Sequence, residues 1–490
     1  MNFPETRNFT GFFAPSGVEA DVPYLPVTAG QVPPELNGSF YRVAPDPHFP
    51  PIAADDIWFN GDGMITRFMF KDGNVGLKQR WVRTDKFLLE QEAGHALFGA
   101  YRNPLTDDPS VKGEIRGTAN TNVMVYAGKL LALKEDSPPV AMDPETLETL
   151  DTHYDFGGKM TSQTFTAHPK IDPKTGNMLA FSYAAKGLLT RDVVFYTINP
   201  AGEIIKEVGF EIPYYCMMHD FGITEDYVVF HVIPITSDWE RLENNLPHFG
   251  FDKKRPIHLG VLPRDGQAED IRWFSAANCF ASHVMNAHNE GTQVFFDTPM
   301  AVGNMFPFFP DYEGADFEPH NAASRMTRWT VDMLSNSDEI KMERLTDLVG
   351  EFPRIDDRFA GLKNRYGWLL CQDMEKPVDL PGGRSASGMM MNTLARLDLE
   401  TGENETYWVG SVSSLQEPAF IPRPGSSEEG DGYLVAIENR LAEMGSRLLL
   451  FNALKISAGP IATLQLPFRI RQGLHGNWAP TPSSAQSIAA

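Results

Sequence analysis

The chain has 490 residues, of which 42% are hydrophobic and 22% are charged, with 33 Phe among them. This composition is typical of a folded protein with a large core and excludes a disordered chain, while the length alone fits either one large all-β unit or two to three average domains. The formal net charge of -22 produces a mean field that repels nucleic acid. We therefore expect no nucleic-acid partner, although a locally basic pocket could still accept a small anion.

A secretory signal has a basic segment followed by a continuous apolar run. The N-terminal stretch MNFPETRNFTGFFAPSG does not have this pattern. No later run approaches the ~20 consecutive apolar residues of a membrane-spanning helix. We therefore expect a cytoplasmic protein without stable membrane association.

Strand-length apolar runs recur along the chain, separated by turn residues. Five turns share one form, in which Asp or Asn begins the turn between two strand-like segments: FKDGNVGL at 70–77, MDPETLET at 142–149, IDPKTGNM at 171–178, INPAGEII at 198–205 and LDLETGEN at 397–404. Such segments are typical of β-hairpins. Hairpins spread over a chain without a clear linker favour antiparallel sheets arranged radially, as in a propeller. The pattern does not give the number of blades, because no strict WD-like or kelch-like repeat is visible.

Helical patterns are few. The segments EQEAGHALFGAYRNPLTDD at 90–108 and TSDWERLENNLPHFG at 236–250 predict short helices with loops, inserted above the sheets. The small, polar tail at 480–490 predicts a disordered end. Three cysteines, Cys216, Cys279 and Cys371, are too few and too far apart for a disulfide framework or a Cys-rich zinc site, and we expect buried thiols.

Four of the twelve histidines end or follow apolar strand-like segments: His168 in QTFTAHPKID, His219 in YYCMMHDFGI, His283 in CFASHVMNAHNEG and His475 in RQGLHGNWAP. An unselected histidine is more often structural than a metal ligand. Strand ends of a rigid scaffold can nevertheless converge, even at separations of 51, 64 and 192 residues. Spacing this wide is weak evidence for a metal site on its own.

The whole chain resembles the carotenoid cleavage oxygenase family. The similarity is carried by the four histidine segments and by further signatures in the right order: LNGSFYRVAPDPHFPP at 36–51, WFNGDGMITRFMF at 58–70, GTANTNVMVYAGKLLALKEDSPP at 117–139, EFPRID at 351–356, EPAFIPRP at 417–424 and EEGDGYLVAI at 428–437. This resemblance implies an all-β fold, a seven-bladed β-propeller that forms one domain over 1–490, with a cap of loops and short helices over an axial metal site.

The resemblance also implies one Fe(II) per chain, held by His168, His219, His283 and His475, with O2 as co-substrate. Four neutral ligands leave coordination positions open and leave the charge of the metal uncompensated. Carboxylates should then accept the free N–H groups of the imidazoles. By family likeness these are Glu135 for His219, Glu351 for His283 and Glu417 for His475. We interpret His288, five residues after His283, as structural.

Members of this family cleave either apolar carotenoids or compact phenolic stilbenes, and residues of the pocket should indicate which of the two this chain accepts. Tyr101 and Lys134 resemble the phenol-binding pair of the lignostilbene and resveratrol-cleaving branch, and Phe59 resembles the aromatic residue that stacks on the substrate ring there. An ammonium and a hydroxyl at one phenol oxygen would lower the pKa of the phenol from ~10, and the phenolate would make the alkene electron-rich. Lys134 precedes Glu135, however, and strand neighbours point to opposite faces, so Lys134 need not enter the pocket.

The segment NMFPFFP at 304–310, with Phe306 at its centre, and Phe280 either line the apolar part of the pocket or belong to the core, and the sequence leaves both alternatives open. The favoured hypothesis is cleavage of the central double bond of a 4-hydroxystilbene by O2 into two aromatic aldehydes. The alternatives are an apocarotenoid or other phenylpropanoid oxygenase on the same iron, and a non-enzymatic propeller that serves as a binding module. By analogy, the stilbene-cleaving relatives also suggest a homodimer.

Overall fold

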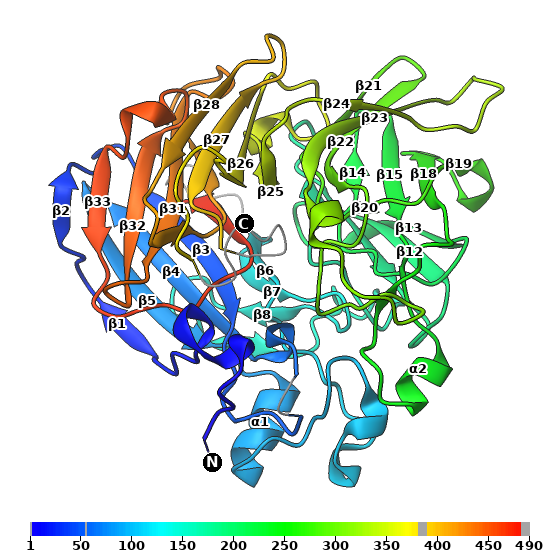
Figure 1. Ribbon diagram of the computed structural model, residues 1–490, viewed down its shortest axis with the longest axis horizontal. Coiled ribbons are helices and arrows are strands. Elements are labelled where there is room, and N and C mark those ends of the chain that lie inside the picture. The colour runs from blue at the N-terminus through cyan, green and yellow to red at the C-terminus, as the bar shows by residue number, and fades with distance from the viewer. Residues whose placement is uncertain (1, 54–55, 381–389, 482–490) are drawn as a thin grey trace.

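The computed structural model describes residues 2–53, 56–380 and 390–481 (Figure 1). Within these ranges, strands form seven antiparallel sheets of four to six strands, arranged in a ring. The prediction of a seven-bladed β-propeller is confirmed. The end of the predicted tail, 482–490, lies outside the described residues.

The first four sheets follow one another along the chain. Their strands, in order across each sheet, are β1 (Ala20–Val22), β5 (Asn74–Trp81), β4 (Gly63–Lys71), β3 (Gly38–Pro45) and β34 (Gly476–Pro480); β6 (Asn122–Tyr126), β7 (Lys129–Leu133), β8 (Val140–Met142) and β9 (Thr149–Asp151); β10 (Lys170–Ile171), β11 (Met178–Tyr183), β12 (Asp192–Ile198) and β13 (Ile204–Glu211); and β14 (Gly222–Ile223), β15 (Tyr227–Val232), β18 (Ile257–Pro263) and β19 (Arg272–Ala276).

Three further sheets complete the ring. Their strands are β20 (Phe280–Ala281) and β21 (Asn286–Glu290), both paired with β22 (Gln293–Ala301), then β23 (Arg325–Asp332) and β24 (Lys341–Arg344); β25 (Val349–Arg354), β26 (Tyr366–Gln372), β27 (Thr393–Asp398) and β28 (Asn404–Trp408); and β29 (Ser413–Leu415) and β30 (Ala419–Pro422), both paired with β31 (Gly432–Arg440), then β32 (Gly445–Asn452), β33 (Ala462–Gln465) and β2 (Val27–Gly30). A separate hairpin pairs β16 (Ile235–Thr236) with β17 (Gly250–Phe251).

The two ends of the chain close the ring by exchanging strands. The C-terminal β34 completes the sheet of the N-terminal β3, and the N-terminal β2 pairs with β33 in the last sheet. Each end of the chain is therefore held by backbone hydrogen bonds to a strand from the other end, which ties the first and last blades together.

All five predicted hairpin turns connect paired strands, and the clearest is at 70–77. There Lys71 of β4 pairs with Asn74 of β5, and Asp72 and Gly73 between them both have positive φ, 49° and 76°. A two-residue turn of this kind needs two left-handed residues, which Asp tolerates and Gly adopts freely.

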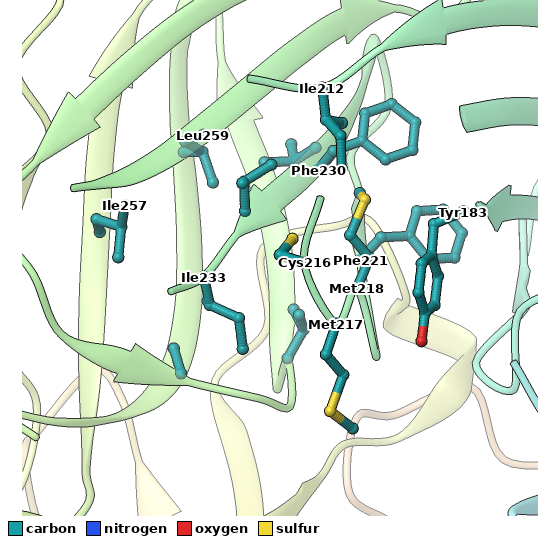
Figure 2. Packing of buried hydrophobic residues seen from close by; sticks show 14 of the residues in the cluster. Tyr183, Ile212, Cys216, Met217, Met218, Phe221, Phe230, Ile233, Ile257 and Leu259 are labelled. Atoms are coloured by element: carbon teal, nitrogen blue, oxygen red, sulfur yellow. The ribbon is translucent and has the colours of Figure 1, made fainter. Parts of the chain in front are cut away.

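The core lies between neighbouring blades. The middle strand β31 is buried along eight of its nine residues, whereas the outer-edge strand β13 has the burial pattern of a strand with one solvent-facing side. Figure 2 shows part of the largest cluster, where Phe221 and Phe230 pack with aliphatic and Met side chains. Burying each such side chain contributes about 1.5–3 kcal/mol. Cys216, in this cluster, is a buried free thiol, as are the other two cysteines, which confirms that prediction.

The two α-helices, α1 (Asp85–Ala93) and α2 (Trp239–Glu243), are short and lie outside the sheets, toward the lower edge of Figure 1. Over the described ranges there are also nine single 3-10 turns: Arg7–Phe9, Gly11–Phe13, Trp58–Asn60, Pro104–Thr106, Pro109–Val111, Ala268–Asp270, Pro319–Ala322, Asp357–Phe359 and Ile456–Ala458. Both segments predicted to hold short helices with loops contain helical turns: 236–250 contains α2, and 90–108 contains the end of α1 and the turn Pro104–Thr106. The first helix begins earlier than the predicted segment, because Thr84 caps its N-terminus, and Gly94, with φ 76°, ends it. Among the described residues, no helix is both long and apolar enough to span a membrane.

Candidate metal centre and cavity

The four predicted histidines all lie next to the first strand of a blade. His168 precedes β10, His219 precedes β14, His283 lies between β20 and β21, and His475 precedes β34. These strands form one edge of their sheets. The same edge of four different blades therefore delivers all four side chains to the axis of the ring, and all four are buried.

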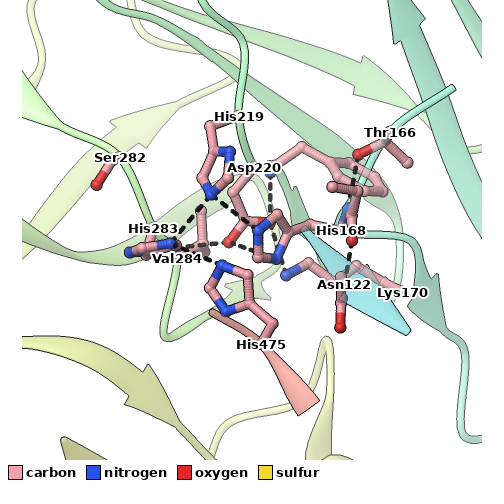
Figure 3. A network of polar contacts seen from close by, with 12 residues as sticks. Asn122, Thr166, His168, Lys170, His219, Asp220, Ser282, His283, Val284 and His475 are labelled. Atoms are coloured by element: carbon pink, nitrogen blue, oxygen red, sulfur yellow. Dashed lines mark hydrogen bonds and ion pairs between the residues drawn. The ribbon is translucent and has the colours of Figure 1, made fainter. Parts of the chain in front are cut away.

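The imidazoles converge through their Nε2 atoms (Figure 3). The Nε2–Nε2 distances are 3.0 Å from His168 to His219, 3.1 Å from His219 to His283 and 3.3 Å from His283 to His475. One nitrogen from each ring lies within 4.8 Å of the others. The structure thus brings together the four residues that the family resemblance selected from twelve.

Three of the four rings are held from behind by a buried carboxylate that accepts a hydrogen bond from Nδ1. The pairs are His219 with Glu135, His283 with Glu351 at 2.7 Å, and His475 with Glu417 at 2.9 Å. These are the three pairs expected from the resemblance. Hydrogen bonding at Nδ1 fixes both the tautomer and the orientation of each ring.

The chemistry of this donor set fits a metal cation. An imidazole that carries its proton on Nδ1 presents a lone pair at Nε2, so three lone pairs face one another across about 3 Å. Without a cation between them this arrangement is repulsive, and with one it is a coordination site. Imidazole suits the borderline divalent metals, iron among them, and four protein ligands leave positions open.

The carboxylates are ionised despite their burial. Burial alone would raise the pKa of Glu135, but the adjoining His219 and the Arg102 guanidinium hold it well below its usual range. Burial likewise opposes ionisation of Glu351, and His283 lowers its pKa. Each carboxylate therefore places negative charge beside its histidine, which would partly offset the charge of a bound cation.

Beside the metal centre lies a cavity with roughly 720 Å³ of empty space, its opening included. Three of the histidines form part of its wall, and most of the remaining wall is apolar. Its apolar lining consists of Phe59, Met217, Met305, Phe306, Phe352, Met391 and Leu474. A largely apolar lining with a few polar groups suits a small aromatic molecule.

Tyr101 and Lys134 form the polar end of the same cavity. The Lys134 Nζ lies 4.9 Å from the centroid of the Tyr101 ring and donates a hydrogen bond to the Phe59 carbonyl at 3.0 Å. Burial lowers the pKa of the Lys134 amine and raises that of the Tyr101 hydroxyl, which therefore stays protonated as a donor. Asp56 holds this end together by accepting from the Tyr101 backbone N–H at 3.1 Å.

The rule that neighbouring side chains on a strand point to opposite faces does not apply to Lys134 and Glu135. The strand β7 ends at Leu133, and a turn begins at Glu135. Both side chains consequently face the cavity, Lys134 at its polar end and Glu135 beside His219.

The two phenylalanines that the sequence left open have different places. Phe306 lines the cavity, whereas Phe280 is fully buried and is not among its lining residues. Phe280 packs edge-on against Phe306, with ring centroids 5.1 Å apart. Of the two alternatives that the sequence left open for Phe280, contact with substrate and a place in the core, the structure favours the place in the core. His288 lies on β21, stacked on Phe295, outside the group of four histidines.

Several residues around the site escaped the sequence reasoning. Thr121 and Ser282 line the cavity, and Ser282 donates to Glu351 at 3.0 Å. Arg102 is buried with a left-handed backbone, φ 52°, and its Nη2 lies 3.5 Å from the Glu135 carboxylate. The position of Arg102 directly after Tyr101 in the sequence was a signal that could have identified it. Ser and Thr carry no comparable signal.

Comparison with known proteins agrees with this geometry. Residues 13–480 match the family model described as retinal pigment epithelial membrane protein. The chain belongs to this family, that of the carotenoid oxygenases. Its similar relatives are named as dioxygenases, monooxygenases and cleavage oxygenases, and the chain is an oxygenase that cleaves carbon–carbon double bonds. The resemblance stated from the sequence is confirmed.

Among its relatives, lignostilbene-alpha,beta-dioxygenase isozyme III of Sphingomonas paucimobilis is 51% identical over 98% of both chains. Isoeugenol monooxygenase of Pseudomonas nitroreducens is 42% identical over 96% of this chain and 98% of the relative. The crystal structure of Pseudomonas brassicacearum lignostilbene dioxygenase superimposes with a TM-score of 0.94 at 45% identity, covering 98% of this chain and all of that one.

Proposed function

We propose that this protein is an iron(II)-dependent dioxygenase that cleaves the central double bond of 4-hydroxystilbenes, such as lignostilbene or resveratrol, into two aromatic aldehydes. One observation carries the proposal: the Tyr101 and Lys134 pair and three of the four clustered histidines line a single, largely apolar cavity. The named activity of the 51% identical relative supports it.

The choice of iron(II), one per chain, rests on the donor set and the family. Four imidazoles backed by three carboxylates suit a borderline divalent ion, and the carotenoid oxygenases are iron-dependent. Bound iron(II) would supply the redox chemistry that lets O2 react with the alkene, whose two carbons each receive one oxygen atom.

Lys134 and Tyr101 would recognise the phenol. An ammonium and a neutral hydroxyl at the phenol oxygen favour the phenolate, because both donate and one is positively charged. Since both side chains are buried, their interaction with the phenolate is screened less than it would be in water. The phenolate then pushes electron density through the conjugated ring to the double bond, which becomes more reactive toward oxygen.

The apolar wall would hold the rings in place. Phe59 adjoins the Lys134 amine through its carbonyl, so its ring lies near the phenol end, and Phe306 lines another part of the wall. Aromatic contacts of this kind contribute about 0.5–1.5 kcal/mol beyond the area they bury. Together these aromatic contacts would favour orientations of the substrate that place its double bond near the metal centre.

Product analysis tests the proposal. Iron-loaded protein should convert resveratrol to two aldehydes under air and should leave its 4'-methyl ether largely intact, because the ether cannot become a phenolate. Equal cleavage of both compounds would contradict the role of Tyr101 and Lys134 while leaving an iron oxygenase in place.

A phenylpropanoid such as isoeugenol is the second candidate substrate, since a 42% identical relative is named for it. It shares the phenol but lacks the second ring. Competition between isoeugenol and resveratrol at equal concentration distinguishes the two, and the preferred compound should have the higher kcat/KM. An apocarotenoid has no phenol, so its cleavage would be insensitive to the loss of the Lys134 amine.

A further inference from the structure

Asp220 is a buried carboxylate at the metal centre that none of the roles above explains. It follows His219 directly and is 2% exposed. It belongs to the polar network around the four histidines (Figure 3). Isolated charges are not buried in proteins without partners, so the partners of Asp220 indicate what it does.

Those partners come from two other ligand-bearing segments. Asp220 Oδ1 pairs with Lys170 Nζ at 2.7 Å, two residues after His168. Asp220 Oδ2 accepts from the backbone N–H of Val284 at 2.8 Å, one residue after His283. A single side chain thus joins the segments that carry three of the four histidines, and these segments belong to three different blades.

His168 is the histidine that this arrangement would affect most. Among the described residues, no carboxylate accepts a hydrogen bond of ordinary geometry from its Nδ1, in contrast to the other three rings. Its nearest acidic atom is Asp220 Oδ2, 4.0 Å from Nδ1. The segment of His168 is instead held through Lys170, whose ammonium is paired with Asp220.

We infer that Asp220 is a positioning residue for the metal centre, and that its ion pair with Lys170 orients His168 in place of the carboxylate that the other three ligands have. This inference rests on the proposed role of the four histidines as metal ligands. Groups that orient metal ligands from behind typically change metal affinity 10- to 100-fold when removed.

Metal binding tests the inference without relying on turnover. Cobalt(II) is added to metal-free protein, its dissociation constant is measured by competition with a chelator, and its visible absorption spectrum reports the coordination. Asp220→Asn keeps an oxygen for the Val284 N–H but loses the ion pair. We expect cobalt(II) to bind about 10- to 100-fold more weakly, with an altered spectrum.

The chain offers a matched control and a conservative rescue. Asp297 is also 2% exposed and pairs with a partly buried cation, Arg328, at 2.8 Å in the sheet of β22 and β23. Asp297→Asn should lower thermal stability comparably but leave cobalt affinity and spectrum unchanged. Lys170→Met should weaken binding as Asp220→Asn does, whereas Lys170→Arg, which can keep the ion pair, should restore most of the affinity.

The outcomes distinguish a failure of the proposed metal centre from a failure of the positioning role of Asp220. If wild-type protein does not bind cobalt(II) at the four histidines, judged against His219→Ala, the proposed metal centre itself fails. If wild-type protein binds and Asp220→Asn matches it within twofold with the same spectrum, the positioning role of Asp220 is overturned. Equal weakening in Asp297→Asn would show a general effect of stability and would overturn it as well.

Discussion

Replacement of Lys134 by Met is the change that should affect catalysis most without removing the metal. Lys134 is 3% exposed and sits at the polar end of the cavity, where the phenol oxygen is expected. Met fills a similar volume but has neither charge nor hydrogen-bond donor. The variant therefore isolates the contribution of the ammonium.

The size of the effect follows from the burial. A hydrogen bond to a charged group contributes about 1.5–3 kcal/mol, and two unit charges 4 Å apart at an effective dielectric constant near 20 interact by about 4 kcal/mol. We take about 3 kcal/mol as the loss, which corresponds to about a 150-fold lower kcat/KM at 1.36 kcal/mol per tenfold change. Since burial lowers the pKa of this amine, its removal should not reduce stability at neutral pH.

Steady-state aldehyde formation from a 4-hydroxystilbene, together with iron content and Tm, measures all three expectations. Lys129→Met is the matched control, because Lys129 begins the same strand, β7, and lies outside the cavity lining. It should keep wild-type activity. A loss below threefold in Lys134→Met would refute the reasoning, and a loss of iron would mean that Lys134 supports the scaffold.

Three further predictions concern the metal, the cavity wall and a buried histidine. Glu351→Gln should weaken iron binding about 10- to 100-fold in a chelator competition, because a neutral amide replaces the carboxylate behind His283. Phe306→Ala should raise KM for stilbenes with little change in Tm. Phe280→Ala should instead lower the free energy of unfolding by about 3–5 kcal/mol, because Phe280 is a core residue. Equal effects of the two variants on KM would contradict these different roles. Burial lowers the pKa of His231 from 6.5 to about 4, against the opposing effect of Asp220, so the folded state favours the neutral ring and stability is lost as pH falls from about 6.5 toward 4. Between pH 7 and 4.5 this loss is about 2.5 kcal/mol, and His231→Leu should lack it in urea unfolding curves.

The sequence predicted the local structure of the blades well, because hairpin turns are determined by adjacent residues. Asp72 and Gly73 are sufficient to specify a two-residue turn between β4 and β5. The number of blades was accessible only by family resemblance. Closure of the ring depends on pairing between β34 and β3, which lie more than 400 residues apart, and no local pattern encodes that contact.

The site shows the same limit. The four histidines and three glutamates could be chosen only by resemblance, because their spacing carries no signal and only the fold brings them together. Lys134 was ambiguous because alternation assumes a continuing strand, and β7 stops one residue earlier. Asp220 could not be identified from the sequence, because its proposed role depends on contacts with Lys170 and Val284 from two other blades.

A crystal structure of the cobalt(II)-loaded protein with resveratrol, prepared without oxygen, tests the central claim most directly. Anomalous diffraction should place a single metal ion among the Nε2 atoms of the four histidines. The 4'-hydroxyl oxygen of resveratrol should lie within hydrogen-bonding distance of Lys134 Nζ and Tyr101 Oη, with its double bond turned toward the metal. Metal elsewhere, or a phenol oxygen remote from both Lys134 and Tyr101, would contradict the account.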